Sequence, residues 1–168
     1  SLKIEGGEET TRLLRERWWT FWHHLFAPRQ LLSLGSFALK IAELAAWVPL
    51  IVGVLGLQRI ADHNSRLSGW SASIGKEIVD HVFANQALNT LSNFGVRGSL
   101  DLESAFKLNL KLYQVTGSSV VEPRDARLVS AMSDIWITDP PYADAVNYHE
   151  LSEFFLAWAD RLIVKCFP

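Results

Sequence analysis

One stretch of this 168-residue chain constrains its fold more than any other: residues 134–142, which read Asp-Ile-Trp-Ile-Thr-Asp-Pro-Pro-Tyr. A short apolar run rich in β-forming residues is typical of a buried strand, and two prolines after an acid are typical of a rigid loop. In open α/β sheets, ligands bind at the carboxyl ends of the strands. The stretch therefore predicts a functional loop at the edge of a sheet.

The loop has a chemical logic of its own. Each proline fixes its own φ and biases the residue before it toward an extended conformation, so Asp139 and Pro140 are both held extended. The carboxylate of Asp139 and the carbonyl of Pro140 can then accept both hydrogens of an exocyclic base amine. This stabilises the positive charge that develops as the amine nitrogen attacks. Tyr142 can stack on a base that has left the duplex. We predict that Asp139, Pro140, Pro141 and Tyr142 are catalytic; the alternative is a strand that ends in a Pro-Pro turn.

The residues after the loop extend this pattern. Residues 148–158 read Tyr-His-Glu-Leu-Ser-Glu-Phe-Phe-Leu-Ala-Trp. Together with the loop they resemble the DUF1156 group of adenine-specific DNA methylases, in which an Asp-Pro-Pro-Tyr loop runs into Tyr-x-x-Leu-Ser-x-Phe-Phe-x-x-Trp. Residues 25–32 and 62–67 also resemble this group. The resemblance implies transfer of a methyl group from S-adenosylmethionine to adenine N6 in DNA.

The resemblance also implies further site residues. In Rossmann-like methyltransferases an acid near the cofactor's adenine follows the strand before the catalytic one, and Asp125 with Ala126 occupies that position. A turn aspartate is the alternative for Asp125. Asp139 is expected to contact the cofactor as well as the amine. The residues expected to contact the substrate are Tyr142, Asp144, Tyr148, Asn64 and Arg66, although residues 62–66 also read as a solvated helix end.

One part of such an enzyme is missing from the sequence. Binding of S-adenosylmethionine in this fold needs a Gly-rich loop that follows a strand. Gly53 and Gly56 lie in an apolar run that reads as a helix, and Gly95 and Gly98 follow no strand. We therefore expect a fragment, inactive alone, or one chain of a split enzyme. Its partners would be DNA and the upstream cofactor-binding region, or a partner chain that carries that region.

The predicted fold class is α/β, as a helix-rich fragment of a Rossmann-like methyltransferase with a few strands in its C-terminal half. Residues 1–95 are expected to form a helical region for target recognition or docking, and residues 96–168 a partial methyltransferase region. A short strand is expected at 119–122, before the one that precedes the loop.

Five helices are expected, with a polar, frayed segment before the first. The expected helices cover 10–26, 28–47, 49–67, 78–91 and a last one that begins after Asn147, and a weaker helical pattern follows Asp101. The segment expected to fray is 1–9. Glu150 stands three residues after Asn147, which predicts a capping box at the start of the last helix.

Composition limits the other possibilities. A net charge of −2 argues against a strongly basic DNA-wrapping surface, so any nucleic-acid contact must use a local patch. A single cysteine excludes a disulfide framework, and the adjacent pair His23 and His24 does not face one side of a helix, so no metal site is expected. The apolar run 44–57 is shorter than the roughly 20 residues of a membrane span, which favours buried core. We expect a cytoplasmic protein with no membrane partner.

Two alternative functions stay open. The helical region may be read as a non-catalytic module that binds DNA or docks a partner, in which the following residues contact phosphates: Arg12, Arg15, Arg17, Arg29 and Arg66. Trp18, Trp19 and Trp22 then either stack on bases or belong to the core. The other alternative is an RNA guanine-N2 methyltransferase fragment, because such enzymes also sometimes carry Asp at the first loop position.

Overall fold

A computed structural model describes residues 2–69, 79–84, 102–107, 116–122, 124–140 and 146–167. The chain divides into two compact units. One unit contains residues 1–108 together with 147–168, and the other contains residues 109–146. We describe each unit by itself. The predicted assignment of a docking region to 1–95 and a methyltransferase region to 96–168 stays a prediction.

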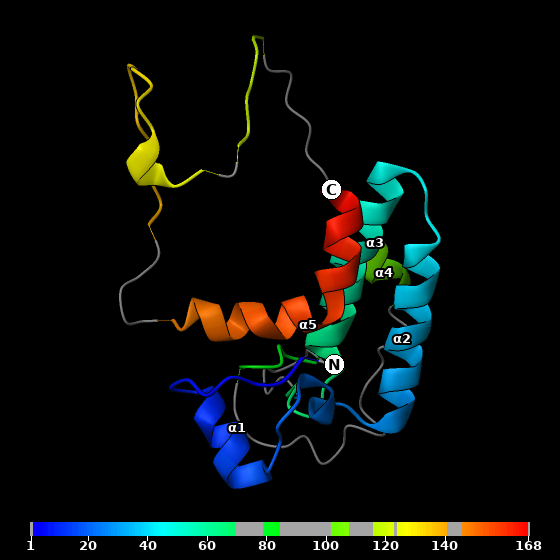
Figure 1. Ribbon diagram of the computed structural model, residues 1–168. Helices are drawn as coiled ribbons and strands as arrows, with labels where there is room; N and C mark the ends of the chain where they lie inside the picture. Colours follow the sequence, from blue (N-terminus) through cyan, green and yellow to red (C-terminus); the bar gives the residue numbers. More distant parts are fainter. Residues whose placement is uncertain are drawn as a thin grey trace, which may run out of the picture. The chain divides into compact units, whose positions relative to one another are not determined.

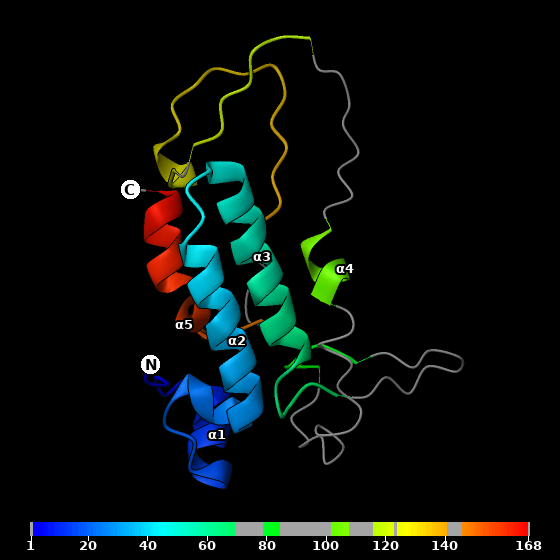
Figure 2. The same ribbon diagram turned by 90° about the vertical axis from the view of Figure 1, so that its right-hand side faces the viewer.

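The described part of the first unit is built from helices. These are α1 (Thr10–Arg17), the 3₁₀ turn η1 (Trp22–Leu25), α2 (Pro28–Ala42), α3 (Trp47–His63), α4 (Leu102–Phe106) and α5 (Tyr148–Cys166). Helices α2 and α3 run in opposite directions side by side, and both views show this hairpin (Figure 1 and Figure 2). Helix α5 packs chiefly against α3 and also contacts α2. None of the described helices is both long and apolar enough to cross a bilayer.

Local sequence explains where α2 and α3 begin. Pro28 is the first residue of α2, as predicted, and the Gln30 side chain accepts a hydrogen bond of 2.7 Å from the Ala27 N–H. Pro49 does not begin or break a helix. It lies in the first turn of α3, where its missing N–H would have no intrahelical partner in any case. The Trp47 indole N–H donates to the Cys166 carbonyl at 3.0 Å and so ties the start of α3 to the end of α5.

An aromatic cluster forms the centre of the core. Phe154 of α5 is fully buried, and its ring lies 5.7 Å from Trp22, 6.0 Å from Phe26 and 5.3 Å from Phe83 between ring centroids. The edge-to-face and offset arrangements are those that aromatic quadrupoles favour. These contacts join η1, the start of α2, the segment 79–84 and α5 around one side chain.

The α/β prediction is wrong for the residues that the structure describes. They contain no strand, and an isolated β-bridge joins Lys3 to Phe21. Residues 134–138, expected as a buried strand, are exposed: Ile135 is 77% accessible and Ile137 is 92% accessible. The expected strand at 119–122 is exposed too, with Val121 94% accessible. A β-forming sequence becomes a strand only where neighbouring strands take its backbone hydrogen bonds and cover its faces, and the described part of the second unit contains no such neighbour.

Two predictions about the first 26 residues are also wrong. Residues 2–9, the described part of this segment, are not frayed, because Ile4 is 2% exposed and its N–H donates to the Thr20 carbonyl at 3.0 Å. The first helix ends at Arg17 instead of Phe26, because Trp18 adopts a left-handed conformation with φ of 58°. Neither a glycine nor a proline marks this break in the sequence.

Glu150 caps a different helix from the one predicted. The Asn147 side chain makes no cap hydrogen bond at the start of α5. The Glu150 carboxylate instead accepts hydrogen bonds from the backbone N–H groups of Thr10, at 2.6 Å, and Glu9, at 3.1 Å, at the start of α1. A carboxylate at a helix N-terminus also interacts favourably with the helix dipole. Two helices far apart in sequence are thereby joined at their first turns.

We expect Glu150→Gln to lower the free energy of unfolding by about 1–2 kcal/mol at neutral pH. The amide lacks the negative charge of the carboxylate and has one oxygen fewer to accept hydrogen bonds from the N–H groups at the start of α1. Burial acts to raise the pKa of Glu150, but hydrogen bonds from Thr10 and Glu9 outweigh it and lower the pKa below 4.5. A carboxylate whose pKa is lower in the folded state stabilises the fold at pH values above its pKa in the unfolded state. This stabilisation is lost as the pH falls through the pKa of the folded state.

The two proteins should therefore converge in stability in acid. Urea denaturation at neutral pH and at about pH 3 measures this, and a difference that persists in acid would contradict the assignment. Asp160→Asn is the matched control, because it makes the same chemical change on an exposed position of α5.

Candidate nucleic-acid interface

A hollow of about 310 Å³ lies where α1 ends, η1 and α2 begin and the chain leaves α3. Its size is at the lower end of the range for small-molecule sites. The residues that line it are Trp18, Trp19, His23, His24, Phe26, Pro28, Leu31 and Arg66. Aromatic rings beside a guanidinium are the combination that binds single-stranded nucleic acids, because bases stack on the rings and phosphates pair with the cation.

Arg66 is held in place on the wall of this hollow. Its backbone N–H donates to the Leu25 carbonyl at 2.7 Å, and its Nη1 donates to the His24 carbonyl at 3.4 Å. The guanidinium carbon lies 5.0 Å from the centre of the Trp19 ring, and that of Arg17 lies 5.4 Å from the same ring. Cation–π contacts of this kind orient a guanidinium and leave N–H groups for a ligand.

Trp18 is the most unusual residue at the hollow. It ends α1 in the left-handed conformation, where its N–H donates to the Leu14 carbonyl at 3.2 Å and the Trp19 N–H donates to the Leu13 carbonyl at 3.3 Å. This position is usually glycine, because a side chain there costs about 1–2 kcal/mol. Its indole is 84% exposed. Trp22, in contrast, is 1% exposed and belongs to the core.

Two arginines of α1, Arg12 and Arg15, are poorly suited to phosphate binding. The Glu16 carboxylate lies 3.2 Å from Arg15 and 3.8 Å from Arg12, and Glu9 lies 3.8 Å from Arg12. Acids at these distances reduce the positive potential that would attract a phosphate. Arg66, which lies beside the Trp19 ring at the hollow, suits the role better than these two.

The two histidines of the hollow offer polar atoms and ring surface. Burial and the neighbouring His24 lower the pKa of His23. His24 accepts a hydrogen bond of 3.1 Å at Nδ1 from the Thr20 N–H. Imidazole rings add stacking surface and hydrogen-bonding groups to the hollow.

The predicted catalytic loop is described only at its start. Asp139 and Pro140 lie in extended, exposed backbone of the second unit. Pro141, Tyr142 and Asp144 fall outside the described residues. Tyr148 is the first residue of α5 and is 46% exposed.

Asp125 and Ala126, predicted to contact the cofactor, lie at the 3₁₀ turn η2 (Ala126–Leu128). Both Asp125 oxygens are engaged by Arg127, whose Nη2 donates to Oδ2 at 2.6 Å and whose Nε donates to Oδ1 at 3.1 Å. Hydrogen bonds from the Arg127 side chain and backbone lower the pKa of Asp125. A ribose or an adenine could reach this carboxylate only if Arg127 moved.

Two predicted substrate contacts lie together just after α3. Asn64 is 8% exposed, and its side-chain nitrogen donates to the Ile60 carbonyl at 2.9 Å, so it supports the helix end. Arg66 faces the hollow. The structure thus places Arg66 close to Trp18 and Trp19, which directly follow α1. The sequence did not predict this proximity.

We compared the chain with known protein families, with curated proteins and with solved structures. None of them matched. The likeness to adenine methylases therefore depends on the signature residues alone, and the function must be argued from the residues and their geometry.

We expect Trp18→Gly to stabilise the protein and to weaken its binding of single-stranded DNA. Glycine adopts the left-handed conformation without strain, so the free energy of unfolding should rise by about 1 kcal/mol. Loss of one stacked base should weaken affinity by about tenfold. Thermal denaturation and fluorescence anisotropy with a labelled oligonucleotide measure the two effects. Trp136→Gly is the control for loss of an exposed indole, and weakened binding in both variants would contradict a specific role for Trp18.

Proposed function

We propose that this chain is part of a site-specific DNA methyltransferase that transfers a methyl group from S-adenosylmethionine to adenine N6. The observation that carries the proposal is the order of the signature. Asp139-Pro140-Pro141-Tyr142 is followed by a helix whose first residue is Tyr148, so the motif Tyr-x-x-Leu-Ser-x-Phe-Phe-x-x-Trp falls within α5. Exposure of Asp139 and Pro140 is compatible with access to a flipped base.

The proposed chemistry concerns the amine. The Asp139 carboxylate and the Pro140 carbonyl each accept one hydrogen of the adenine amino group, which favours the tetrahedral nitrogen of the transition state. Tyr142 stacks on the base. S-adenosylmethionine supplies the methyl group, and Asp125 could contact it only after release from Arg127. The proposal therefore assigns most of the cofactor site to an upstream region or a partner chain.

The loop region is followed in sequence by Tyr148, the first residue of α5, and the first turn of α5 is fixed to α1 through Glu150. In the proposal this connection anchors the chain directly after the loop. Because the substrate is intracellular DNA, the proposal places the protein in the cytoplasm.

Expression of the full-length gene in a host that lacks adenine methylation tests the proposal. Digested DNA should contain N6-methyladenine, measured by mass spectrometry, and the host RNA should contain no additional N2-methylguanine. Methylguanine in RNA without methyladenine in DNA would instead select the RNA alternative. Absence of both modifications would count against a methyltransferase.

The second candidate function is nucleic-acid binding without catalysis, and the Trp18–Trp19–Arg66 wall of the hollow favours it. Replacement of Arg66 by glutamine should weaken binding of single-stranded DNA and lower the slope of log affinity against log salt by about 0.7, the value for one phosphate contact. Arg15→Gln is the matched control, because Glu16 already neutralises that side chain. Equal effects of the two variants would contradict a specific contact at Arg66.

A further inference from the structure

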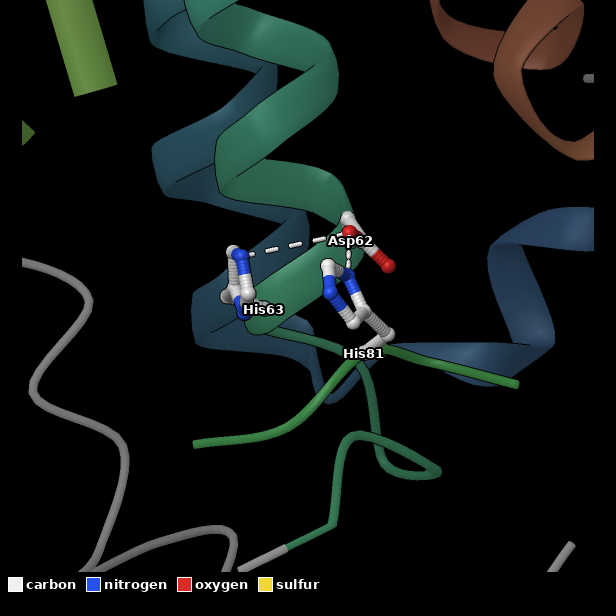
Figure 3. Close-up of side chains that lie close together, drawn as sticks. All are labelled: Asp62, His63 and His81. Carbon is white, nitrogen blue, oxygen red and sulfur yellow. Dashed lines mark hydrogen bonds and ion pairs between the residues drawn. The ribbon is translucent and has the colours of Figure 1, made fainter. Parts of the chain in front are cut away.

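Three potential metal ligands meet at the end of α3. Asp62 and His63 belong to its last turn, and His81 comes from the segment 79–84 (Figure 3). One ligand atom from each residue lies within 4.8 Å of the others. His81 Nδ1 is 2.5 Å from Asp62 Oδ2, and His63 Nε2 is 3.9 Å from the same oxygen. Figure 3 shows both imidazoles next to this carboxylate oxygen.

The hydrogen bonds around the cluster orient His63 and Asp62, while His81 Nδ1 and Asp62 Oδ2 are hydrogen-bonded to each other. His63 Nδ1 lies 3.2 Å from the Val79 carbonyl, which can only accept, so Nδ1 carries the hydrogen and Nε2 keeps its lone pair toward Asp62. The other carboxylate oxygen of Asp62 accepts from the Val82 N–H at 3.0 Å. Metal-binding histidines commonly donate their second N–H to a carbonyl in this way, and ligating carboxylates are likewise held by a hydrogen bond.

The cluster is also rigidly supported. The Asp80 N–H donates to the Gly69 carbonyl at 2.8 Å, and Val82 is 1% exposed in the core on the other side of His81. The Ser68 hydroxyl donates to the Asp62 carbonyl at 2.7 Å. Two segments separated by 18 residues of sequence are thus fixed so that an exposed imidazole, His81, stands over a largely buried carboxylate.

We propose that Asp62, His63 and His81 bind a divalent transition metal, with Zn²⁺ as the preferred ion. Two imidazoles and one carboxylate are a ligand set that Zn²⁺ uses when a fourth position is left to water. Ligand atoms in a tetrahedral zinc site are about 3.4 Å apart, and small side-chain rotations bring the observed separations to that value. The ion would replace the Asp62–His81 hydrogen bond and join the end of α3 to residues 79–84.

Metal titration of the untagged full chain tests this inference. Zn²⁺ at about 100 times its dissociation constant should raise the melting temperature by about 5–10 °C, and Co²⁺ should give the absorption bands of a four-coordinate site. Loss of a residue that only hydrogen-bonds to a metal ligand lowers metal affinity by about 10–100-fold. His81→Asn and Asp62→Asn each remove a ligand and should lower Zn²⁺ affinity by more than this. The exposed position of His81 makes its replacement compatible with folding.

The control is a double variant, His23→Asn with His24→Asn, which removes the other pair of neighbouring imidazoles. It should bind Zn²⁺ as the unchanged protein does. The inference is overturned if Zn²⁺ does not raise the melting temperature of the unchanged protein. It is also overturned if His81→Asn or Asp62→Asn keeps the full Zn²⁺ affinity, or if replacement of His23 and His24 abolishes Zn²⁺ binding. None of these outcomes depends on methyltransferase activity.

Discussion

Under the proposed function, replacement of Asp139 by alanine in the full-length protein should lower adenine methylation by about 100-fold or more and leave DNA affinity nearly unchanged. The carboxylate is proposed to accept one hydrogen of the attacking amine, an interaction that strengthens as positive charge develops on nitrogen. Such an interaction contributes to the transition state and little to binding of the substrate. Single-turnover methyl transfer and filter binding, measured on the same protein preparation, separate the two quantities.

A nearby acid provides the control for this variant. Asp134 lies five residues earlier in the same exposed stretch, so Asp134→Ala removes a carboxylate of the same kind from the same segment. It should leave methylation within about twofold, the range of ordinary surface substitutions. Full activity of Asp139→Ala, or equal losses in both variants, would disprove the catalytic assignment.

The largest effect on stability is expected at Phe154. Replacement by alanine removes the ring that contacts Trp22, Phe26 and Phe83, and should cost about 3–5 kcal/mol. For a domain of this size the melting temperature should fall by about 6–20 °C. Urea denaturation followed by tryptophan fluorescence measures the change, because Trp22 is among the affected contacts.

Phe167→Ala is the matched control, because this phenylalanine directly after α5 is 66% exposed and its ring lies edge-on to that of Trp47. It should cost less than about 1 kcal/mol. Phe154→Leu should fall between the two, since leucine refills part of the cavity. A loss at Phe154→Ala as small as that at Phe167→Ala would show that the aromatic cluster does not hold the unit together.

Local sequence rules predicted the elements whose signals are local. Pro28 marked the start of α2, and the apolar stripe of the last helix led to α5, in which Phe154 is buried. The same stripe explains part of the likeness to methylases, because Phe154 and Trp158 serve packing whatever the loop does. Signature residues that also satisfy a core do not by themselves identify a reaction.

The errors arose where structure depends on distant partners. Ile135 and Ile137 have the composition of a buried strand, but a strand exists only with neighbours that pair with it. The sequence suggested that Glu150 pairs with the nearby Asn147. In the structure its carboxylate accepts hydrogen bonds from backbone N–H groups at the start of α1. The left-handed Trp18 carries no sequence signal, and the approach of His81 to Asp62 is set by tertiary packing that periodicity does not reveal.

The role of the first nine residues has a practical consequence for protein engineering. A truncation designed from the polar sequence would delete Ile4 from the core and the Glu9 N–H that Glu150 binds. Gly7 passes so close to that carboxylate that a methyl group there would overlap it unless the Glu150 side chain shifted. Engineered changes are better placed after this segment, because a change in residues 2–9 disturbs the contact between α1 and the first turn of α5.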